Sequence, residues 1–324
     1  MIVFLLKRLG GTLVVMLAVT AIAFVMFNYL GDPVVAILGQ DASESARRAV
    51  EQQLGLDRPI TVRFLSYLAD VLRGDFGLSY RLGQPVMDVI VDRLPATIEL
   101  AFSGMGIALL IGVPCGVYSA IQRNSAGTRV LLGASLVGIS VPTFFVGVVL
   151  IWVFSVTLGV LPSFGRGQTV DLGWWTTGFL TPSGLAALVL PATSIAVFQI
   201  AMIMRLVRAE MLEVIRSDYV QFARARGLPE SRIYFRHALK NTLIPVITII
   251  ALQLGSLIAF AVITESVFQW PGLGLLFLQS VAAADVTIMS AYLILIAGLF
   301  VVINLAVDLL YFAIDPRLRA RAGR

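Results

Sequence analysis

Six apolar stretches, each long enough to cross a bilayer as a helix, constrain this chain more than any other feature of its sequence. They are Leu9–Leu30, Pro95–Ile121, Val130–Leu161, Gly184–Met204, Leu243–Ile263 and Ile288–Phe312. A helix needs about 20 apolar residues to span the ~30 Å hydrocarbon core. Only 13% of the residues are charged, against about 25% in a soluble domain. The sequence therefore predicts an all-α integral membrane protein with six transmembrane helices.

The first stretch follows Lys7 and Arg8, as the apolar region of a signal peptide would. It is longer than the roughly 7–15 apolar residues of such a peptide, and no convincing small-residue cleavage site follows it. We expect it to be retained as an N-terminal anchor helix.

The basic residues are unevenly distributed between the segments that join the spans. Segments 1–8, 122–129, 205–242 and 313–324 hold 16 Lys and Arg residues and 5 Asp and Glu residues, whereas the alternating segments hold 8 and 11. Lys and Arg are enriched on the cytoplasmic side of membrane proteins. We therefore expect both termini in the cytoplasm, and the net charge of +5 requires no nucleic-acid partner.

The chain divides into an anchor with an external segment (1–94), a membrane domain (95–315) and a basic cytoplasmic tail (316–324). The external part should contain three short helices. Asp41 and Glu44 fit a capping box for the first, which Gly55 ends, and Pro59 opens the second. The third is expected over Pro85–Leu94. Such helices suit two roles, either covering the lipid headgroups or forming a docking surface for an external protein.

Small residues and prolines indicate that the spans pack together as a bundle. Gly112, Gly116 and Ala120 recur at intervals of four residues, a spacing that lets a second helix approach closely. Prolines at Pro114, Pro142 and Pro191 interrupt the spans. Neighbouring helices must satisfy the carbonyl groups that these prolines leave free.

Several kinds of chemistry are missing from the sequence. It contains no Gly-x-x-x-x-Gly-Lys-Ser/Thr phosphate loop, so we expect no ATP site. His237 is the sole histidine and Cys115 the sole cysteine, and Cys115 lies in an apolar stretch. A zinc site or a Ser-His-Asp triad cannot be assembled from this set. We therefore expect no catalytic, metal or cofactor site, and no enzyme activity.

Polar residues within the spans are sparse. Gln199, Gln253 and Asn304 can either form hydrogen bonds between helices or line a pathway. Glu265, just before the sequence "VFQWPGLG", is expected to cap a helix, with a pathway role as the alternative. Ion-coupled transporters bury ionisable groups at the membrane centre, and the spans lack them there. A secondary transporter or a channel is therefore disfavoured.

The cytoplasmic segment 205–242 is the most polar part of the membrane domain. Within it, Asp218 can cap a helix of about two turns that Gly227 ends, with Leu228 folding back onto Ala223 and Pro229 opening the next helix. On its own, so short a helix is only marginally stable in water, so we expect that something else holds it.

The side chains of this short helix suggest what it contacts. Tyr219, Phe222 and Ala223 are predicted to share one face, and the small Ala225 leaves the backbone approachable. Arg224 adds charge near the helix end. Two interpretations follow from the residues alone. The helix either seats in a groove of a cytosolic partner or lies on the anionic inner leaflet.

This segment resembles the EAA loop of ABC-importer permeases, in the variant "DYVxxARAxGL…RHALxNxxIP" of the peptide-importer branch. The match is Asp218-Tyr219-Val220, Ala223-Arg224-Ala225-Arg226-Gly227-Leu228, Arg236-His237-Ala238-Leu239-Lys240-Asn241 and Ile244-Pro245. Of the Glu-Ala-Ala triplet itself only Ala223 is kept, and Lys240 replaces the usual downstream proline.

The resemblance extends over nearly the whole chain, through "LGLDRPITVRFLSYLADVLRGDFGLSYRLGQPV", "RLPATIELA", "VFQWPGLG" and "DPRLR". It is closest to the B-type permease subunit of dipeptide and oligopeptide importers. One departure is Ala284-Asp285-Val286-Thr287, where the family commonly has Arg-Asp-Tyr-Pro.

The resemblance implies a type I ABC importer permease fold in a bacterial inner membrane, with 95–315 as the permease domain. It also implies a C-type permease partner, two ATPase subunits that bind ATP and Mg²⁺, and an external binding protein. The segment around Asp218, Tyr219, Phe222, Ala223, Arg224, Ala225, Gly227 and Leu228 would contact an ATPase. Peptides are the expected cargo, with nickel, glutathione or an opine-like compound as alternatives.

Overall fold

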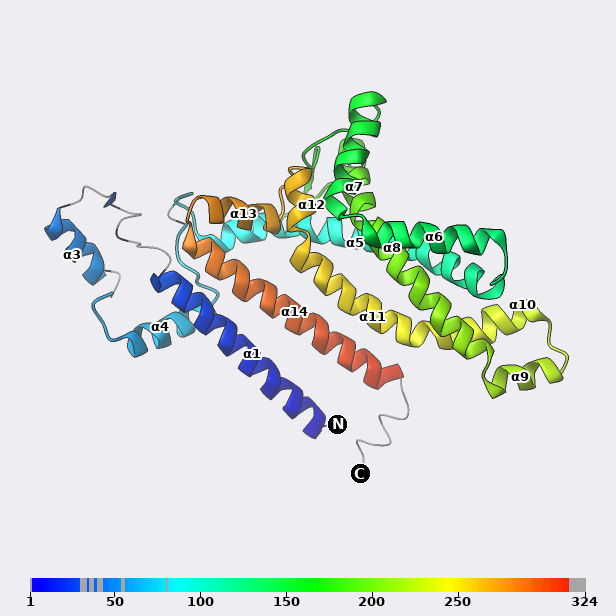
Figure 1. The fold of residues 1–324 in the computed structure, drawn as a ribbon. Coiled ribbons are helices and arrows are strands. Elements are labelled where there is room, and N and C mark those ends of the chain that lie inside the picture. Colours follow the sequence, from blue (N-terminus) through cyan, green and yellow to red (C-terminus); the bar gives the residue numbers. More distant parts are fainter. Residues whose placement is uncertain are drawn as a thin grey trace.

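The fold is an elongated bundle of helices, and a computed structural model of the chain describes residues 2–29, 34, 38–39, 43–53, 56–79 and 81–314 (Figure 1). Four helices are long and apolar enough to cross a membrane. They are α1 (Ile2–Tyr29), α5 (Val86–Ile121), α8 (Pro182–Ile215) and α14 (Val286–Ile314). The number rises to six if each of two bent helix pairs counts as one span, in agreement with the predicted six-span helical fold.

Shorter elements complete the chain. On the side of the bundle where α1 ends lie α3 (Glu44–Gln53), α4 (Ile60–Leu72), α12 (Val262–Val267) and α13 (Leu273–Ala282). The remaining helices are α6 (Ala126–Ser140), α7 (Thr143–Leu150), η1 (Ile151–Thr157), α9 (Asp218–Ala225), α10 (Glu230–Arg232), η2 (Ile233–Ala238) and α11 (Leu239–Phe260), of which η1 and η2 are π-helical. Two short antiparallel strands, β1 (Val170–Asp171) and β2 (Thr176–Thr177), pair Val170 with Thr177 in the loop before α8.

The third predicted span, Val130–Leu161, is not one straight helix. It consists of α6 and the α7–η1 segment, which meet at an angle of 103°. The break falls at Pro142, which caps α7, and the preceding Val141 is extended with φ −85° and ψ 125°. A proline disfavours helical geometry in the residue before it, so the apolar run bends instead of continuing.

The predicted separate helix over Pro85–Leu94 is also wrong, although Pro85 does begin a helix. From Val86 onward the chain forms the first turns of α5, which continues through Pro95 to Ile121. Val86 and Val89 are buried in a cluster with side chains of α13 and α14. This packing stabilises a single helix across the expected boundary. The domain division at 94/95 therefore falls within α5 and stays a prediction.

Small residues bring α5 and α8 into close contact, as the glycine spacing predicts. A Cβ atom built on Gly112 would lie 3.1 Å from the Ile203 side chain, and one on Gly116 would lie 2.7 Å from Val207 Cβ and 2.8 Å from the Met204 carbonyl oxygen. The two helices share a buried apolar cluster that continues to α11. The interface therefore has no space for a side chain at residue 116.

We expect Gly116→Ala to destabilise the protein by about 1–3 kcal/mol, because overpacking a fitted interface forces the two helices apart. Gly106→Ala on the same helix is the matched control, since no atom lies within 4 Å of its Cβ position. Thermal unfolding of the purified protein in detergent measures the difference. Equal melting temperatures for the two variants would contradict the close approach at Gly116.

Candidate functional site

The segment that joins α8 to α11 lies at one end of the bundle and contains the short helix α9 (Figure 1). Helix α8 runs for 34 residues without a break and reaches from the bundle to Ile215. At 1.5 Å per residue it is about 51 Å long. Helix α8 therefore leads without interruption from the bundle to the turn before α9.

Helix α9 begins one residue earlier than predicted. Its N-cap is Ser217, which is extended, and Asp218 is the first helical residue, so the prediction that Asp218 caps the helix is wrong. The Ser217 hydroxyl donates to the Val214 carbonyl at 2.6 Å and leaves no side-chain cap. Asp218 still favours the helix, because a carboxylate in the first turn interacts with its positive end. The Gln221 amide donates to the Arg216 carbonyl at 3.1 Å, just before the helix begins.

The end of α9 has the predicted Schellman geometry. Gly227 has φ +73°, in the left-handed region that glycine tolerates best. The Leu228 amide donates to the Ala223 carbonyl at 3.3 Å, and the Gly227 amide donates to the Arg224 carbonyl at 2.8 Å. Pro229 then caps α10. The chain therefore turns sharply at a defined residue.

The predicted face of Tyr219, Phe222 and Ala223 is divided between two sides of the helix. Val220 and Ala223 are buried against Ile233 of η2. Tyr219 and Phe222 remain 42% and 65% exposed. Ala223 thus holds α9 on the protein and is not available to a partner, because residues three apart share a helix face and Val220 sets the buried one.

Polar contacts also fix α9. The Tyr219 hydroxyl accepts from the Asn241 amide at 2.7 Å, and the Arg224 guanidinium donates to the Glu230 carboxylate at 2.9 and 3.3 Å. The hydrogen bond from Arg224 lowers the pKa of Glu230. The contact therefore stabilises the protein at neutral pH and weakens as the pH falls through the lowered pKa, although solvent exposure limits its strength.

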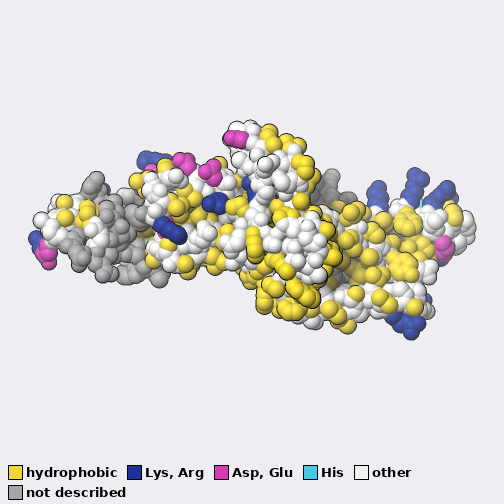
Figure 2. Space-filling model, turned by 90° about the horizontal axis from the view of Figure 1, so that it is seen from above, with side chains coloured by type: hydrophobic (Ala, Val, Ile, Leu, Met, Phe, Trp, Pro, Cys, Tyr) yellow, Lys and Arg dark blue, Asp and Glu magenta, His cyan; other side chains and the backbone are white. Residues whose placement is uncertain are grey.

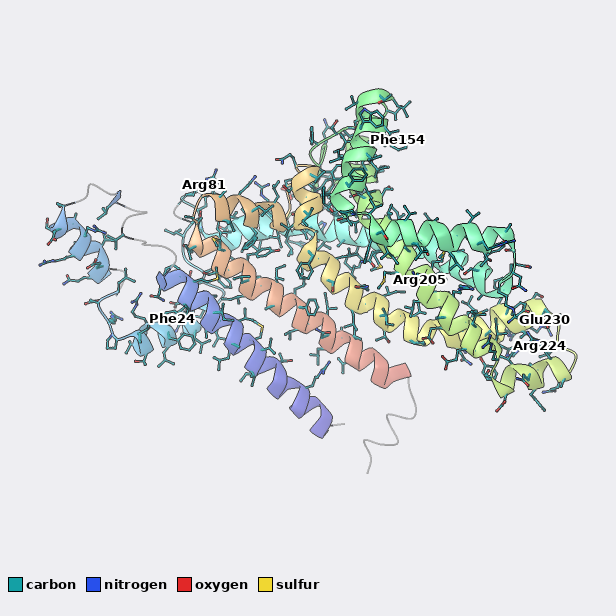
Figure 3. The ribbon with its side chains drawn as sticks, in the orientation of Figure 1. Phe24, Arg81, Phe154, Arg205, Arg224 and Glu230 are labelled. Carbon is teal, nitrogen blue, oxygen red and sulfur yellow. The ribbon has the colours of Figure 1, made fainter. Side chains whose placement is uncertain are left out.

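The surface around α9 is strongly basic. Figure 2 shows Lys and Arg side chains gathered at the end of the molecule that holds α9 and α10, while acidic side chains concentrate elsewhere. The exposed cations of this end include Arg216, Arg224, Arg226, Arg232, Arg236 and Lys240. Figure 3 places Arg224 and Glu230 beyond the tip of α8. Ala225 is exposed, and the Arg226 guanidinium lies 5.9 Å from the centre of the Phe222 ring.

The polar residues predicted within the spans do not form one cluster in the described structure. Gln199 is buried, and its Oε1 atom has no hydrogen-bond partner among the described residues. Gln253 and Asn304 are half-buried, and Asn304 lines an apolar cavity between α1 and α14. Glu265 is fully buried and accepts from the Leu275 amide at 2.9 Å, so it caps α13. Pathway roles for these residues stay predictions.

Sequence reasoning missed a buried ion pair near the β1–β2 loop. The Arg166 guanidinium lies 2.7 Å from the Glu99 carboxylate, with side-chain exposures of only 7% and 2%. Arg166 also donates to the Thr176 carbonyl at 2.6 Å, and the Gly178 amide donates to Glu99 at 3.2 Å. The two charged residues are 67 positions apart. The one available signal was the position of Glu99 within an apolar stretch.

A bundle with four to six apolar helices that are long enough to cross a bilayer defines the class of multi-pass membrane proteins. The chain belongs to the family of binding-protein-dependent transport system inner membrane components. Residues 112–320 match the model of this family, and residues 1–101 match the model of the N-terminal membrane component of such systems. The predicted family is confirmed. The chain is therefore a non-catalytic permease subunit of the ABC importer family and a multi-pass protein of the bacterial inner membrane.

Relatives of known name align over nearly the full chain. The sequence is 36% identical over 332 residues to the dipeptide transport system permease protein DppB of Alkalihalophilus pseudofirmus, covering 98% of this chain and 100% of that protein. It is 38% identical over 331 residues to the probable D,D-dipeptide transport system permease protein DdpB of Escherichia coli K12, covering 98% and 97%. An inward-facing structure of the MetNI methionine ABC transporter has the same fold, with a TM-score of 0.58 and 22% identity over 72% of this chain and 100% of that one.

Proposed function

We propose that this chain forms half of the translocation pathway of an ATP-driven importer of dipeptides and oligopeptides. The names of relatives that align over 98% of the chain support the cargo class. The other half would come from a homologous C-type permease, and an external binding protein would deliver the peptide. ATP and Mg²⁺ would bind to two ATPase subunits, and this chain would hold no cofactor.

The observation that carries the proposal is the packing of α9 against η2 and α11. Helix α9 is short, yet Val220 and Ala223 pack it against η2 and the Asn241–Tyr219 hydrogen bond ties it to α11. Its opposite side exposes Phe222 and Tyr219 within a basic surface. An apolar anchor with a charged rim suits a groove on a protein partner. In our proposal this groove belongs to an ATPase subunit.

The proposed partner contacts differ in kind along α9. Asp218, Tyr219, Phe222, Arg224 and Ala225 are exposed and would contact the ATPase. Gly227 and Leu228 would act indirectly, by setting the direction in which the chain leaves the helix. Ala223 would support the helix from inside.

Movement of α9 would reach the membrane through α8. Because α8 is continuous, it would transmit rotation to α5 across the close contact at Gly116. The Arg208 guanidinium also donates to the Ser119 carbonyl of α5 at 3.3 Å. ATP-driven closure of the two ATPases would then switch the pathway between inward- and outward-facing states. The excess of Lys and Arg in segment 205–242 supports a cytoplasmic location for α9 and for both termini.

Site-specific crosslinking tests the proposed contact. In a Cys115→Ala background, Phe222→Cys should crosslink to an ATP-hydrolysing subunit in the assembled importer, because its side chain is 65% exposed. Ser45→Cys on α3, also exposed but located at the other end of the molecule, is the control and should not crosslink. Uptake of a labelled dipeptide by proteoliposomes should require ATP. Uptake without nucleotide, or no crosslink from residue 222, would refute the proposal.

A further inference from the structure

A cavity of about 780 Å³ lies at the end of the bundle opposite α9, where the N-terminal segment meets the membrane domain. Its walls come from α1, the segment at residues 56–58, α4, the loop residues 75–79 and 83, and the start of α14. This volume falls within the range of small-ligand pockets, about 300–1,000 Å³. The cavity is separate from the α8–α9 segment.

Aromatic contacts hold the walls in place. The Phe24 ring of α1 lies 5.3 Å from the Phe64 ring and 5.6 Å from the Tyr67 ring of α4, measured between centroids. On the other side, the Ser79 hydroxyl of the loop donates to the buried Asp285 carboxylate at 2.5 Å. The cavity is thus bounded by elements that are fixed to one another.

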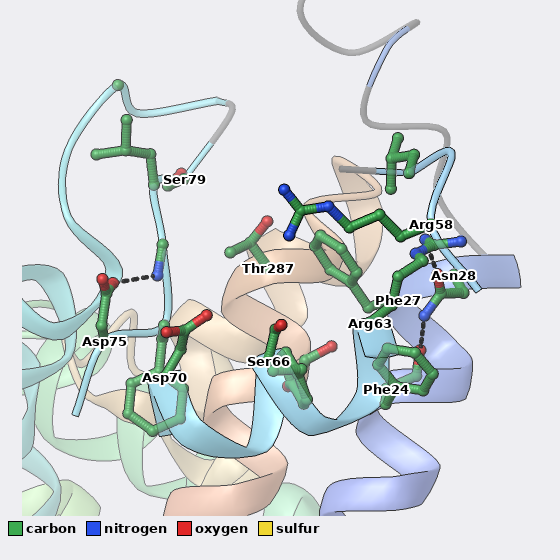
Figure 4. A pocket seen from close by; sticks show the side chains of 17 residues that line it. Phe24, Phe27, Asn28, Arg58, Arg63, Ser66, Asp70, Asp75, Ser79 and Thr287 are labelled. Atoms are coloured by element: carbon green, nitrogen blue, oxygen red, sulfur yellow. Dashed lines mark hydrogen bonds between the residues drawn. The ribbon is translucent and has the colours of Figure 1, made fainter. Parts of the chain in front are cut away.

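Charges of opposite sign line the two sides of the cavity. Figure 4 shows Asp70 and Asp75 on one side and the Arg58 guanidinium extending into the cavity from the other. Within the described residues Arg58 makes no hydrogen bond or ion pair. Among the described residues, the Asp70 carboxylate has only a 4.0 Å contact with Arg73, and one oxygen of Asp75 accepts from the Gly77 amide at 2.9 Å. Both carboxylates therefore keep acceptor capacity for a ligand.

A buried hydroxyl group also lacks a partner in this cavity. Thr287 is only 5% exposed, and its Oγ1 atom has no hydrogen-bond partner among the described residues. A buried polar group without a partner costs about 1–3 kcal/mol, which a bound acceptor would recover. Thr287 is in the first turn of α14, where the helix dipole favours an anion. It belongs to the tetrapeptide that departs from the family pattern, and it stands where that pattern has proline.

The hydroxyl groups nearby remain donors at neutral pH. Burial raises the pKa of Tyr67 to about 12, so its phenol stays protonated. Ser66 also lines the cavity, whereas the hydroxyl of Ser290, which lines it too, donates to the Ala23 carbonyl at 3.3 Å. The site therefore offers donors around the middle, a cation on one side and carboxylates on the other.

We propose that this cavity binds a small zwitterion, with its anionic group at Arg58 and Thr287 and its ammonium group at Asp70 and Asp75. Two sources supply this chemistry, a short peptide from outside the cell or a phosphatidylethanolamine headgroup from the membrane. Because the walls belong to both the N-terminal segment and α14, a bound zwitterion would stabilise their contact. This inference does not depend on ATP-driven transport, because binding to the isolated chain tests it.

The test uses the full chain in nanodiscs of phosphatidylglycerol and measures binding of alanyl-alanine by titration calorimetry. Arg58→Gln and Asp70→Asn should each weaken binding by about tenfold or more, since each removes one charge-assisted hydrogen bond. Thr287→Val should weaken it by about threefold. N-acetyl-alanyl-alanine lacks the ammonium group, so Asp70→Asn should leave its weak binding unchanged. Glycerophosphoethanolamine serves as the headgroup probe.

Matched variants outside the cavity provide the controls. Arg48→Gln and Asp88→Asn change the same charges at exposed positions that do not line the cavity, and should bind alanyl-alanine normally. Tighter binding of glycerophosphoethanolamine, with the same dependence on Arg58 and Asp70, would support the zwitterion site and assign it to lipid. Binding of neither probe would overturn the proposal, as would alanyl-alanine binding that both variants leave unchanged.

Discussion

Replacing Gly227 with valine should reduce ATP-driven dipeptide uptake by about tenfold while leaving the chain inserted in the membrane. Gly227 has φ +73°, and no atom lies within 4 Å of the position that a Cβ atom would occupy. The valine side chain would therefore clash with no neighbouring residue, and the cost of the substitution comes from the backbone conformation. A left-handed conformation costs about 1–2 kcal/mol for an L-residue, and about 1.4 kcal/mol corresponds to a factor of ten.

This cost falls on the element that the proposed function requires. Helix α9 has only eight residues, and the hydrogen bond from the Leu228 amide to the Ala223 carbonyl closes its end. When residue 227 relaxes toward negative φ, this bond breaks and the turn into Pro229 changes direction. The exposed Phe222 side chain then loses its fixed orientation, although α8 and the rest of the bundle are unaffected.

Gly227→Asn is the matched control, because asparagine enters the left-handed region more readily than other residues with a side chain. It should retain most of the uptake, whereas valine should not. The measurements are uptake into proteoliposomes, substrate-stimulated ATP hydrolysis and the amount of protein in the membrane. If valine and asparagine behaved alike, the backbone conformation at Gly227 would not matter for coupling.

The features that the sequence predicted correctly follow from rules that act within a few residues. Glycine in the left-handed region ends α9, proline begins α10, and the spacing of Gly112 and Gly116 allows α8 to approach α5. Each depends on backbone conformation or on the absence of a side chain. The resemblance to importer permeases added the family and the role proposed for this segment.

The features that were missed depend on contacts between distant residues. The apolar length of Val130–Leu161 does not reveal the 103° bend, because a proline can also be tolerated within a straight membrane helix. The side of α9 that faces inward is set by Ile233 on another helix, so Ala223 was assigned to the exposed face. The pairing of Arg166 with Glu99 crosses 67 positions, and no local pattern connects them.

The Arg166–Glu99 pair leads to the largest expected effect on stability. Glu99→Gln should lower the free energy of unfolding by about 3–5 kcal/mol, because removal of one partner leaves an uncompensated charge in a buried site. The variant keeps the size of the side chain, so the loss reports on charge rather than packing. Unfolding of the purified protein by heat, or by increasing concentrations of a denaturing detergent, measures the change in free energy.

A double variant separates the charge penalty from the value of the pair. Glu99→Leu combined with Arg166→Met should recover most of the loss, since replacing both partners of a buried pair by apolar residues is often nearly neutral. The exposed pair of Arg48 and Glu44, with side-chain exposures of 76% and 87%, is the control. Glu44→Gln should cost less than about 1 kcal/mol. If Glu99→Gln were as mild as this control, solvent would have to reach Arg166. The loop that carries β1 and β2 would then be held on α5 by its backbone contacts, such as the Gly178 amide, and not by the ion pair.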